Sequence, residues 1–284
     1  MSVNTTTVVQ AGQANVPERL RMLWRYRELV ISLAVRELKA RYKNTVLGFF
    51  WSLLNPLAMM LVFTMVFTVF MPKHEIKNFP IFVLCGLLPW NYFTAGVMGS
   101  IPVIVGNANL VTKVYFPREV LPLATVLANL FNFLLTLVVL FAALLIARTP
   151  LSPWLWLLPV VILIQSCFIL GLALLLSTLN VFYRDTMMVM DVAMLAWFFL
   201  TPIFYPIETL PKSYLLLGMD LNLHRLMYIL NPMASIVNTY RDLLYHGYRT
   251  DFDFFIRTAV TALVTLAFGY WIFCNYSNRF GEEV

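Results

Sequence analysis

Apolar residues are concentrated in six long stretches along this chain. The stretches cover residues 46–70, 80–105, 120–147, 154–181, 187–204 and 254–275. A helix needs about 20 consecutive apolar residues to cross the hydrocarbon core of a bilayer, and each stretch is near or above that length. The pattern therefore predicts an all-α integral membrane protein with six transmembrane helices.

A more polar segment, residues 18–45, comes before the first stretch. Within its residues 28–43, apolar side chains recur at helical spacing, and basic side chains lie about a quarter turn away from them. The apolar positions are Ile31, Ala34, Val35, Leu38 and Tyr42, and the basic ones are Arg36, Lys39 and Lys43. This arrangement is typical of an amphipathic helix lying at a membrane surface. The segment is either the positive flank of the first transmembrane helix or a cytoplasmic lever that contacts a soluble partner.

The connection between the fifth and sixth stretches, residues 205–253, is too apolar for a plain loop. Asn231 and Pro232 are typical of a helix N-cap followed by proline at the first helical position. An apolar stripe follows, and Gly247 is placed to end that helix. Because Leu215–Leu217 supplies another short apolar segment, we expect two short helices that re-enter the outer leaflet. A surface helix packed on lipid would give the same pattern. The stripe consists of Met233, Ile236, Val237, Tyr240 and Leu244.

Composition and charge fix the environment and the orientation. The chain is 61% hydrophobic and 12% charged, with a mean hydropathy of +0.79, whereas soluble domains carry about 25% charged residues. The net charge is +6, and basic residues are concentrated in the first 43 positions, directly before the first apolar stretch. This placement fits the positive-inside rule of membrane proteins better than a nucleic-acid-binding surface. We therefore expect both termini in the cytoplasm. The three parts predicted are a mobile tail (1–17), the amphipathic region (18–45) and the transmembrane domain (46–284).

Catalytic chemistry is hard to find in this sequence. Cys85, Cys167 and Cys274 are far apart, and neither a metal-ligand spacing nor a GxxxxGK[ST], HExxH or GxSxG motif is present. We predict no catalytic residue, no metal site and no cofactor on this chain, so that energy must come from elsewhere. Asp191 is the clearest ionisable residue within a span; it is either functional or simply near the inner interface, within reach of Arg184.

Two further features are candidates for contact. The loop 107–119 is amphipathic, with apolar residues at helical spacing before Pro117, and is either a contact element or a connector that only caps two helices. Aromatic residues make up 15% of the chain. Most are expected to serve packing or the interfacial belt, but flat rings also suit sugar C–H faces. The aromatic residues predicted to line a substrate path are Phe49, Trp51, Trp90, Tyr92, Phe199, Phe204 and Tyr205.

Several motifs, in the same order, resemble one family. They are residues 36–43 (RELKARYK), Leu47-Gly48-x-x-Trp51-x-x-x-Asn55-Pro56, residues 113–119 (KVYFPRE), 181–185 (VFYRD), 201–206 (TPIFYP) and 230–232 (LNP). From about residue 20 to the C-terminus, the chain is similar to permease subunits of type-2 ABC exporters of polysaccharide, O-antigen or teichoic acid.

This resemblance implies a specific assembly. It implies a six-span homodimer in the bacterial cytoplasmic (inner) membrane, with two copies of a separate ABC-type ATPase that binds ATP and Mg. The substrate would be a lipid-linked glycan or polyol-phosphate polymer, and the two short outer helices would form a gate. The alternatives are an ABC exporter of a small lipid or drug, and a membrane enzyme of glycolipid assembly. The residues implied to contact the ATPase are Arg36, Lys39, Arg41, Lys43, Leu110, Lys113, Tyr115 and Arg118.

Overall fold

The structure is a computed structural model. It describes residues 16–66, 78–149, 152–206, 213–216, 219–222, 227, 229, 231–247, 250 and 252–284. Residues 1–15 of the predicted tail lie outside this description, and Val16 and Pro17 already belong to the first helix.

Long helices dominate the described residues. The N-terminal part contains α1 (Val16–Arg25), α2 (Arg27–Tyr42), the 3-10 turn η1 (Gly48–Phe50) and α3 (Trp51–Met65). The central part contains α4 (Phe79–Ser100), α5 (Val103–Gly106), α6 (Ala108–Lys113), α7 (Val120–Ile146), η3 (Pro153–Leu157) and α8 (Leu158–Phe182). The last part contains α9 (Thr186–Leu200), β1 (Ser213–Leu216), β2 (Met219–Asn222), α11 (Pro232–Arg241), a π-helical turn η5 (Asp242–His246), α12 (Phe252–Tyr276), η6 (Ser277–Arg279) and α13 (Phe280–Glu283).

Four described helical segments are long and apolar enough to cross a membrane, as judged by length and composition. They are Phe79–Ser100, Val120–Ile146, Pro153–Phe182 and Asp253–Glu283. Two shorter apolar helical segments, Leu53–Val62 and Thr186–Leu200, lie in the first and fifth predicted stretches. The sequence-based prediction of a multi-pass, mainly helical membrane protein is confirmed, while the count of six spans stays a prediction.

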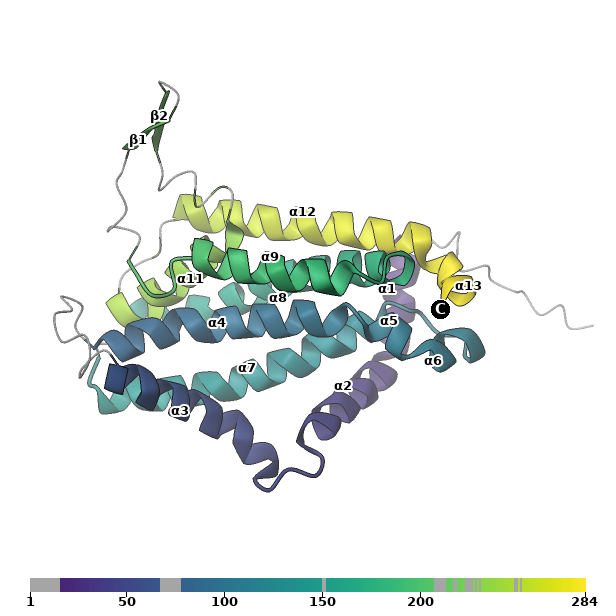
Figure 1. The fold of residues 1–284 in the computed structure, drawn as a ribbon, viewed down its shortest axis with the longest axis horizontal. Coiled ribbons are helices and arrows are strands. Elements are labelled where there is room, and N and C mark those ends of the chain that lie inside the picture. The colour runs from purple at the N-terminus through teal and green to yellow at the C-terminus, as the bar shows by residue number, and fades with distance from the viewer. Residues whose placement is uncertain are drawn as a thin grey trace, which may run out of the picture.

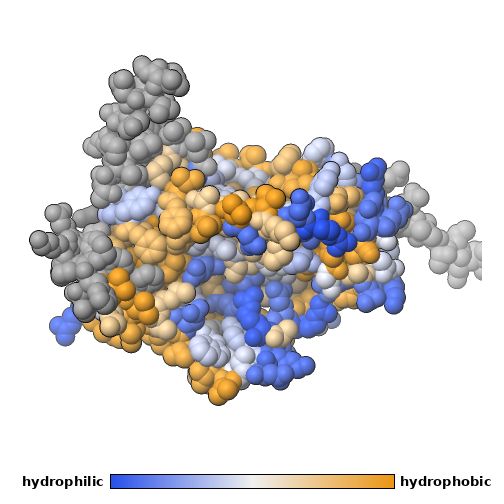
Figure 2. Space-filling model, viewed as in Figure 1, coloured by the Kyte–Doolittle hydropathy of each residue, from blue (hydrophilic) through white to orange (hydrophobic). Residues whose placement is uncertain are grey.

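The long helices lie side by side around α4 (Figure 1). Because α4 is apolar along most of its length, most of its residues are buried, and it packs on α7, α8 and α11. A second apolar cluster lies at the end where α1, α6 and α13 gather, and it includes Val30, Leu33 and Phe280. Hydrophilic residues are concentrated at this same end, whereas apolar side chains cover much of the remaining visible surface (Figure 2).

The helix predicted after Asn231 is present with both of its expected ends. The Asn231 side chain accepts a hydrogen bond from the Ala234 backbone N–H at 3.1 Å, and Pro232 is at the first helical position. The π-helical turn ends at Gly247, which has the left-handed φ of 74° that glycine tolerates. The stripe that contains Met233 and Tyr240 is buried against the bundle.

The second short helix was predicted around Leu215–Leu217, and this prediction is wrong for the described residues. Ser213–Leu216 and Met219–Asn222 form an antiparallel pair of strands, with Tyr214 opposite Leu221. An apolar run of three residues has no periodicity that separates a helix from a strand, and it is too short to repay helix nucleation.

Candidate functional site

Helix α2 is attached to α7 through polar side chains. Three hydrogen bonds join the two helices at successive turns, because their partners on α7 lie on one helical face. The bonds run from Thr125 Oγ1 to Glu37 Oε2 (2.8 Å), from Arg41 to Asn129 Oδ1 (3.0 Å) and from the Tyr42 hydroxyl to Asn132 Oδ1 (3.0 Å). Helix α2 is therefore fixed to a long helix of the bundle.

Helix α2 also has an apolar side that packs on the protein. Val30, Leu33 and Ala34 are buried, whereas Ile31 and Val35 of the predicted apolar face are 58% and 40% exposed. Ala34 and Leu38 of the predicted apolar face thus pack on the protein, while Ile31 and Val35 of the same face remain exposed.

The four basic residues predicted on α2 divide into two pairs. Arg36 donates to Asn107 Oδ1 at 2.8 Å and so links α2 to the connection between α5 and α6. Arg41 is held by Asn129. Lys39 and Lys43 are exposed. Arg36 and Arg41 therefore make contacts within the chain, although all four basic side chains are exposed.

The predicted contact loop forms helix α6 and the segment that follows it. Val111 is buried and Leu110 packs beside it in the second apolar cluster. Lys113 is exposed, and Tyr115 keeps 69% of its surface accessible. The predicted apolar stripe is thus confirmed for Leu110 and Val111, whereas Val114 and Tyr115 follow the end of α6 and are exposed.

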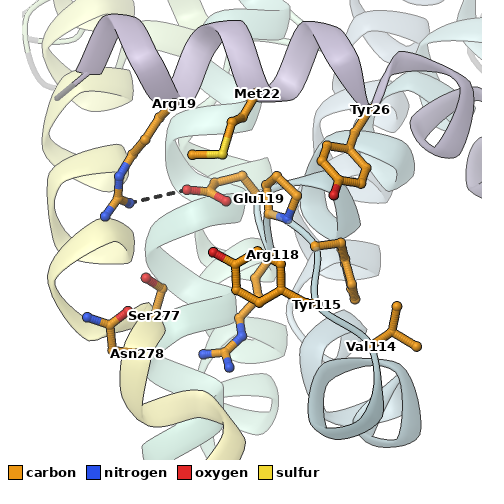
Figure 3. A pocket seen from close by; sticks show the side chains of 11 residues that line it. Arg19, Met22, Tyr26, Val114, Tyr115, Arg118, Glu119, Ser277 and Asn278 are labelled. Carbon is orange, nitrogen blue, oxygen red and sulfur yellow. Dashed lines mark hydrogen bonds and ion pairs between the residues drawn. The ribbon is translucent and has the colours of Figure 1, made fainter. Parts of the chain in front are cut away.

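This segment lines a cavity of about 260 Å³ together with α1 and the C-terminal end of the chain (Figure 3). We call it the loop pocket. Its residues are Arg19, Met22, Tyr26, Val114, Tyr115, Phe116, Pro117, Arg118, Glu119, Ser277 and Asn278.

One ion pair closes the loop pocket on the side of α1. Arg19 lies 3.4 Å from the Glu119 carboxylate, and both side chains are largely buried. The Arg118 guanidinium lies over the Phe280 ring, 5.9 Å from its centroid. Burial lowers the pKa of Arg118, and the neighbouring Glu119 and Tyr115 act in the opposite direction. Because an arginine does not lose its proton in proteins, Arg118 presents a fixed positive charge here.

Sequence reasoning included Glu119 in the contact loop but did not indicate that Arg19 and the C-terminal residues lie against it. The two partners of the ion pair are 100 positions apart, and no local pattern in a single sequence connects them.

The predicted aromatic residues occupy two kinds of environment. Trp90 and Tyr92 are buried in α4, while Trp51 and Phe199 keep 46% and 67% of their surfaces exposed. Phe204 and Tyr205 are partly buried beyond the end of α9, where Phe204 contacts the Phe198 ring. Phe49 lies in η1, and its side chain is outside the described part of the chain. The role of these residues in a substrate path stays a prediction.

Asp191 is exposed on the described surface of α9. Its functional role stays a prediction. Among the described residues, no group of three or more His, Cys, Asp or Glu side chains is arranged to hold a metal ion.

A buried arginine ties the helices together at the end of the bundle where α11 lies. Arg241 is 2% exposed and donates hydrogen bonds to the backbone carbonyls of Phe82, Pro202 and Ile203. Its guanidinium also lies 3.7 Å from the centre of the Phe82 ring. The sequence held a signal for this role, because Arg241 follows Val237 by one helical turn on the apolar face.

Comparisons with known proteins agree over most of the chain. The family described as "ABC-2 type transporter" matches residues 28–245. An O-antigen export system permease protein, RfbA, of Myxococcus xanthus is 39% identical over 93% of this chain and 98% of its own length. RfbA of Klebsiella pneumoniae is 30% identical over 90% and 94%, and the polysialic acid transport protein KpsM of Escherichia coli is 25% identical over 84% and 90%.

Proposed function

Because this chain belongs to the ABC-2 type transporter family, we propose that it is the membrane permease of an ATP-driven exporter of lipid-linked polysaccharide. One observation carries the proposal: the chain matches an O-antigen export permease over 98% of that protein's length. The similarity therefore extends over most of the chain and is not limited to a single shared segment.

The proposed arrangement in the membrane has six spans, formed by α3, α4, α7, η3 with α8, α9 and α12. Both termini are then cytoplasmic, and the membrane is the bacterial inner membrane. The concentration of basic residues on α1 and α2 supports this orientation. Helix α11 and the residues it holds through Arg241 then lie on the outer side, where we assign them to the gate.

ATP hydrolysis belongs, in this proposal, to a separate ABC-type subunit, which holds ATP and Mg. Its docking surface is the loop pocket with Lys39, Lys43 and Lys113. The support is geometric, because an exposed aromatic ring (Tyr115) stands beside a cavity with a fixed positive charge. A tyrosine or arginine at the centre of an interface contributes a large part of binding energy.

Two copies of this chain form the proposed transporter, each with one ATPase subunit. The exposed apolar faces of α3 and α9 supply surface for a second copy. They include Leu57 and Leu61 on α3, and Met188 and Val192 on α9.

Deletion of the gene tests the function directly. We expect surface polysaccharide to disappear and lipid-linked polymer to accumulate inside the cell, and we expect the intact gene to restore export. Unchanged surface polysaccharide in the deletion strain would refute the proposal.

The docking surface has its own test. Tyr115→Ala and Lys113→Glu should each reduce co-purification of the ATPase and lower its transport-dependent hydrolysis. Trp156→Ala is the matched control, because Trp156 is equally exposed but lies in η3 at the opposite end of α8. Equal recovery of the ATPase with all three variants would remove the docking role.

A further inference from the structure

A second cavity, of about 310 Å³, lies where α2, α3, α4 and α7 meet. We call it the asparagine cavity, because four of its lining residues are asparagines from three different helices. Figure 1 shows α2 and α3 diverging from the turn that joins them, with α7 and α4 alongside. The residues that carry the argument are Asn55, Asn91, Asn129, Asn132, Arg41 and Trp51.

The amides of this cavity keep unused hydrogen-bonding capacity. Asn129 is satisfied, since it accepts from Arg41 and donates to the Thr125 carbonyl. Asn132 accepts from the Tyr42 hydroxyl, but its buried Nδ2 has no acceptor among the described residues. Turning that amide over exchanges its two atoms and leaves the oxygen without a donor instead. A buried polar atom of this kind needs a ligand or water to satisfy it.

The other two amides are also open. Among the described residues, the acceptor for Asn91 Nδ2 is the Met59 sulfur, at 3.9 Å, and a thioether is a weak acceptor. Asn55 makes no hydrogen bond within the described part of the chain and is exposed. The cavity therefore offers both donors and acceptors from three sides.

An aromatic wall stands beside these amides. Trp51 is about half exposed and lines the cavity. Tyr92 also lines it, stacked on Phe133 with ring centroids 4.9 Å apart and nearly parallel planes. A sugar ring presents hydroxyl groups that both donate and accept, together with flat C–H faces that pack on aromatic rings. Amides beside an indole match that combination.

The charge of the cavity favours a neutral ligand. Of the described residues that line the cavity, Arg41 alone is charged at neutral pH, and its guanidinium also lies 4.0 Å from the Glu37 carboxylate. A diphosphate group would require more positive charge than this. The volume is near the lower limit of the roughly 300–1,000 Å³ typical of ligand pockets, which suits a single ring and not an extended chain.

We infer that the asparagine cavity binds one neutral sugar ring of the exported glycan, within a single copy of this chain. This inference rests on the proposed function and adds a place where the glycan is recognised. Trp51 and Tyr92, which the sequence placed on a substrate path, would be part of this subsite. Asn55, Asn91 and Asn132 would supply its hydrogen bonds.

Binding to the full-length protein in detergent tests the inference. Saturation-transfer NMR would be recorded with D-glucose, D-galactose, D-mannose and N-acetyl-D-glucosamine as separate probes, and sodium pyrophosphate would then be added as an anionic competitor. At least one sugar should bind, and Asn55→Leu and Asn132→Leu should each weaken its binding at least tenfold. Asn275→Leu is the matched control, because Asn275 is an exposed asparagine on α12, outside the cavity.

The outcomes separate this inference from the proposed function. Sugar binding that is lost in the two cavity variants, with unchanged melting temperatures, supports the subsite. Equal sugar binding by all variants, binding of no sugar, or displacement of the sugar by pyrophosphate overturns it. Export is measured in the same variants. If deletion of the gene abolishes surface polysaccharide but both cavity variants export normally, the sugar subsite is refuted while the proposed export function is supported.

Discussion

The glycine contact between α8 and α12 gives a prediction that can be worked out from distances. Helices α8 and α12 share the most extensive contact between described elements, and Gly171 and Gly269 meet at it. A Cβ atom added at Gly269 would lie 2.1 Å from the Gly171 carbonyl oxygen and 2.9 Å from its carbon. Because both atoms belong to the backbone, no side-chain rotation can relieve the clash.

The cost of Gly269→Ala follows from that geometry. Contacts between an aliphatic carbon and a carbonyl oxygen are about 3.3 Å or longer, so the helices must separate locally by roughly 1.2 Å. Overpacking costs about 1–3 kcal/mol and sometimes more, and a rigid backbone clash belongs at the upper end. Replacing glycine by alanine inside a helix returns up to about 1 kcal/mol. We therefore expect a net loss of at least about 2 kcal/mol.

Gly106→Ala is the matched control. A Cβ atom at Gly106 would meet no described atom within 4 Å apart from the adjacent backbone, and Gly106 does not have a positive φ. Gly106→Ala avoids the clash and keeps the stabilisation that alanine gives to a helix. The free energies of unfolding of the two variants should therefore differ by about 3 kcal/mol. Gly96→Ala should fall between them, because its Cβ would meet the Ile169 side chain and not a backbone atom.

Thermal unfolding of the three variants in one detergent, at one scan rate, measures the series. A difference of 3 kcal/mol corresponds to roughly 6–12 °C between Gly269→Ala and Gly106→Ala for a chain of this size class. Equal midpoints for these two variants would show that the α8–α12 crossing is not as close as the distances indicate.

Three further predictions concern polar contacts. Arg241→Met leaves the carbonyls of Pro202 and Ile203 without their donor, so the free energy of unfolding should fall by at least about 3 kcal/mol. Arg241→Lys should recover only part of this loss in a thermal assay. For the Arg19–Glu119 pair, a double-mutant cycle with Arg19→Met and Glu119→Gln should give a coupling of about 1–2 kcal/mol; additive single effects would contradict it. Asn231→Ala removes the cap of α11 and the acceptor of the Trp197 indole N–H, so the free energy of unfolding should fall by about 2–3 kcal/mol. Amide hydrogen exchange in residues 232–241 should become faster, and unchanged protection would refute the role of the cap.

Local signals in the sequence predicted the helices well. Long apolar stretches gave the positions of α4, α7, α8 and α12, because a helix that is apolar all along needs no distant partner to be recognised. The N-cap at Asn231 and the end at Gly247 were readable because a capping side chain and a positive φ act within a few residues. The hairpin at Ser213–Asn222 was not readable, since strand pairing depends on register between two short segments.

Local patterns in the sequence did not predict the polar contacts between helices that are distant along the chain. Arg41 and Asn129 are 88 positions apart, and each was compatible with a solvent-facing or partner-facing role. The polar residues on α7 lie at helical spacing within an apolar stretch, so a single sequence could reveal their face. It could not reveal that Glu37, Arg41 and Tyr42 would cover that face. For the same reason, the sequence did not indicate that the exposed side chains of Arg36 and Arg41 also form hydrogen bonds within the chain.

The position of α2 connects the two cavities. Arg41 and Tyr42 line the asparagine cavity, and their helix is joined through Arg36 to Asn107, which precedes the contact helix α6. A partner that moves α2 and α6 against α7 would therefore change the shape of the asparagine cavity. Thermodynamic linkage then makes the effect reciprocal: a sugar that prefers one position of α2 must change the affinity for the ATPase by the same factor. Measuring ATPase binding to the permease with and without the sugar tests this coupling, and identical affinities would show that the two cavities act independently.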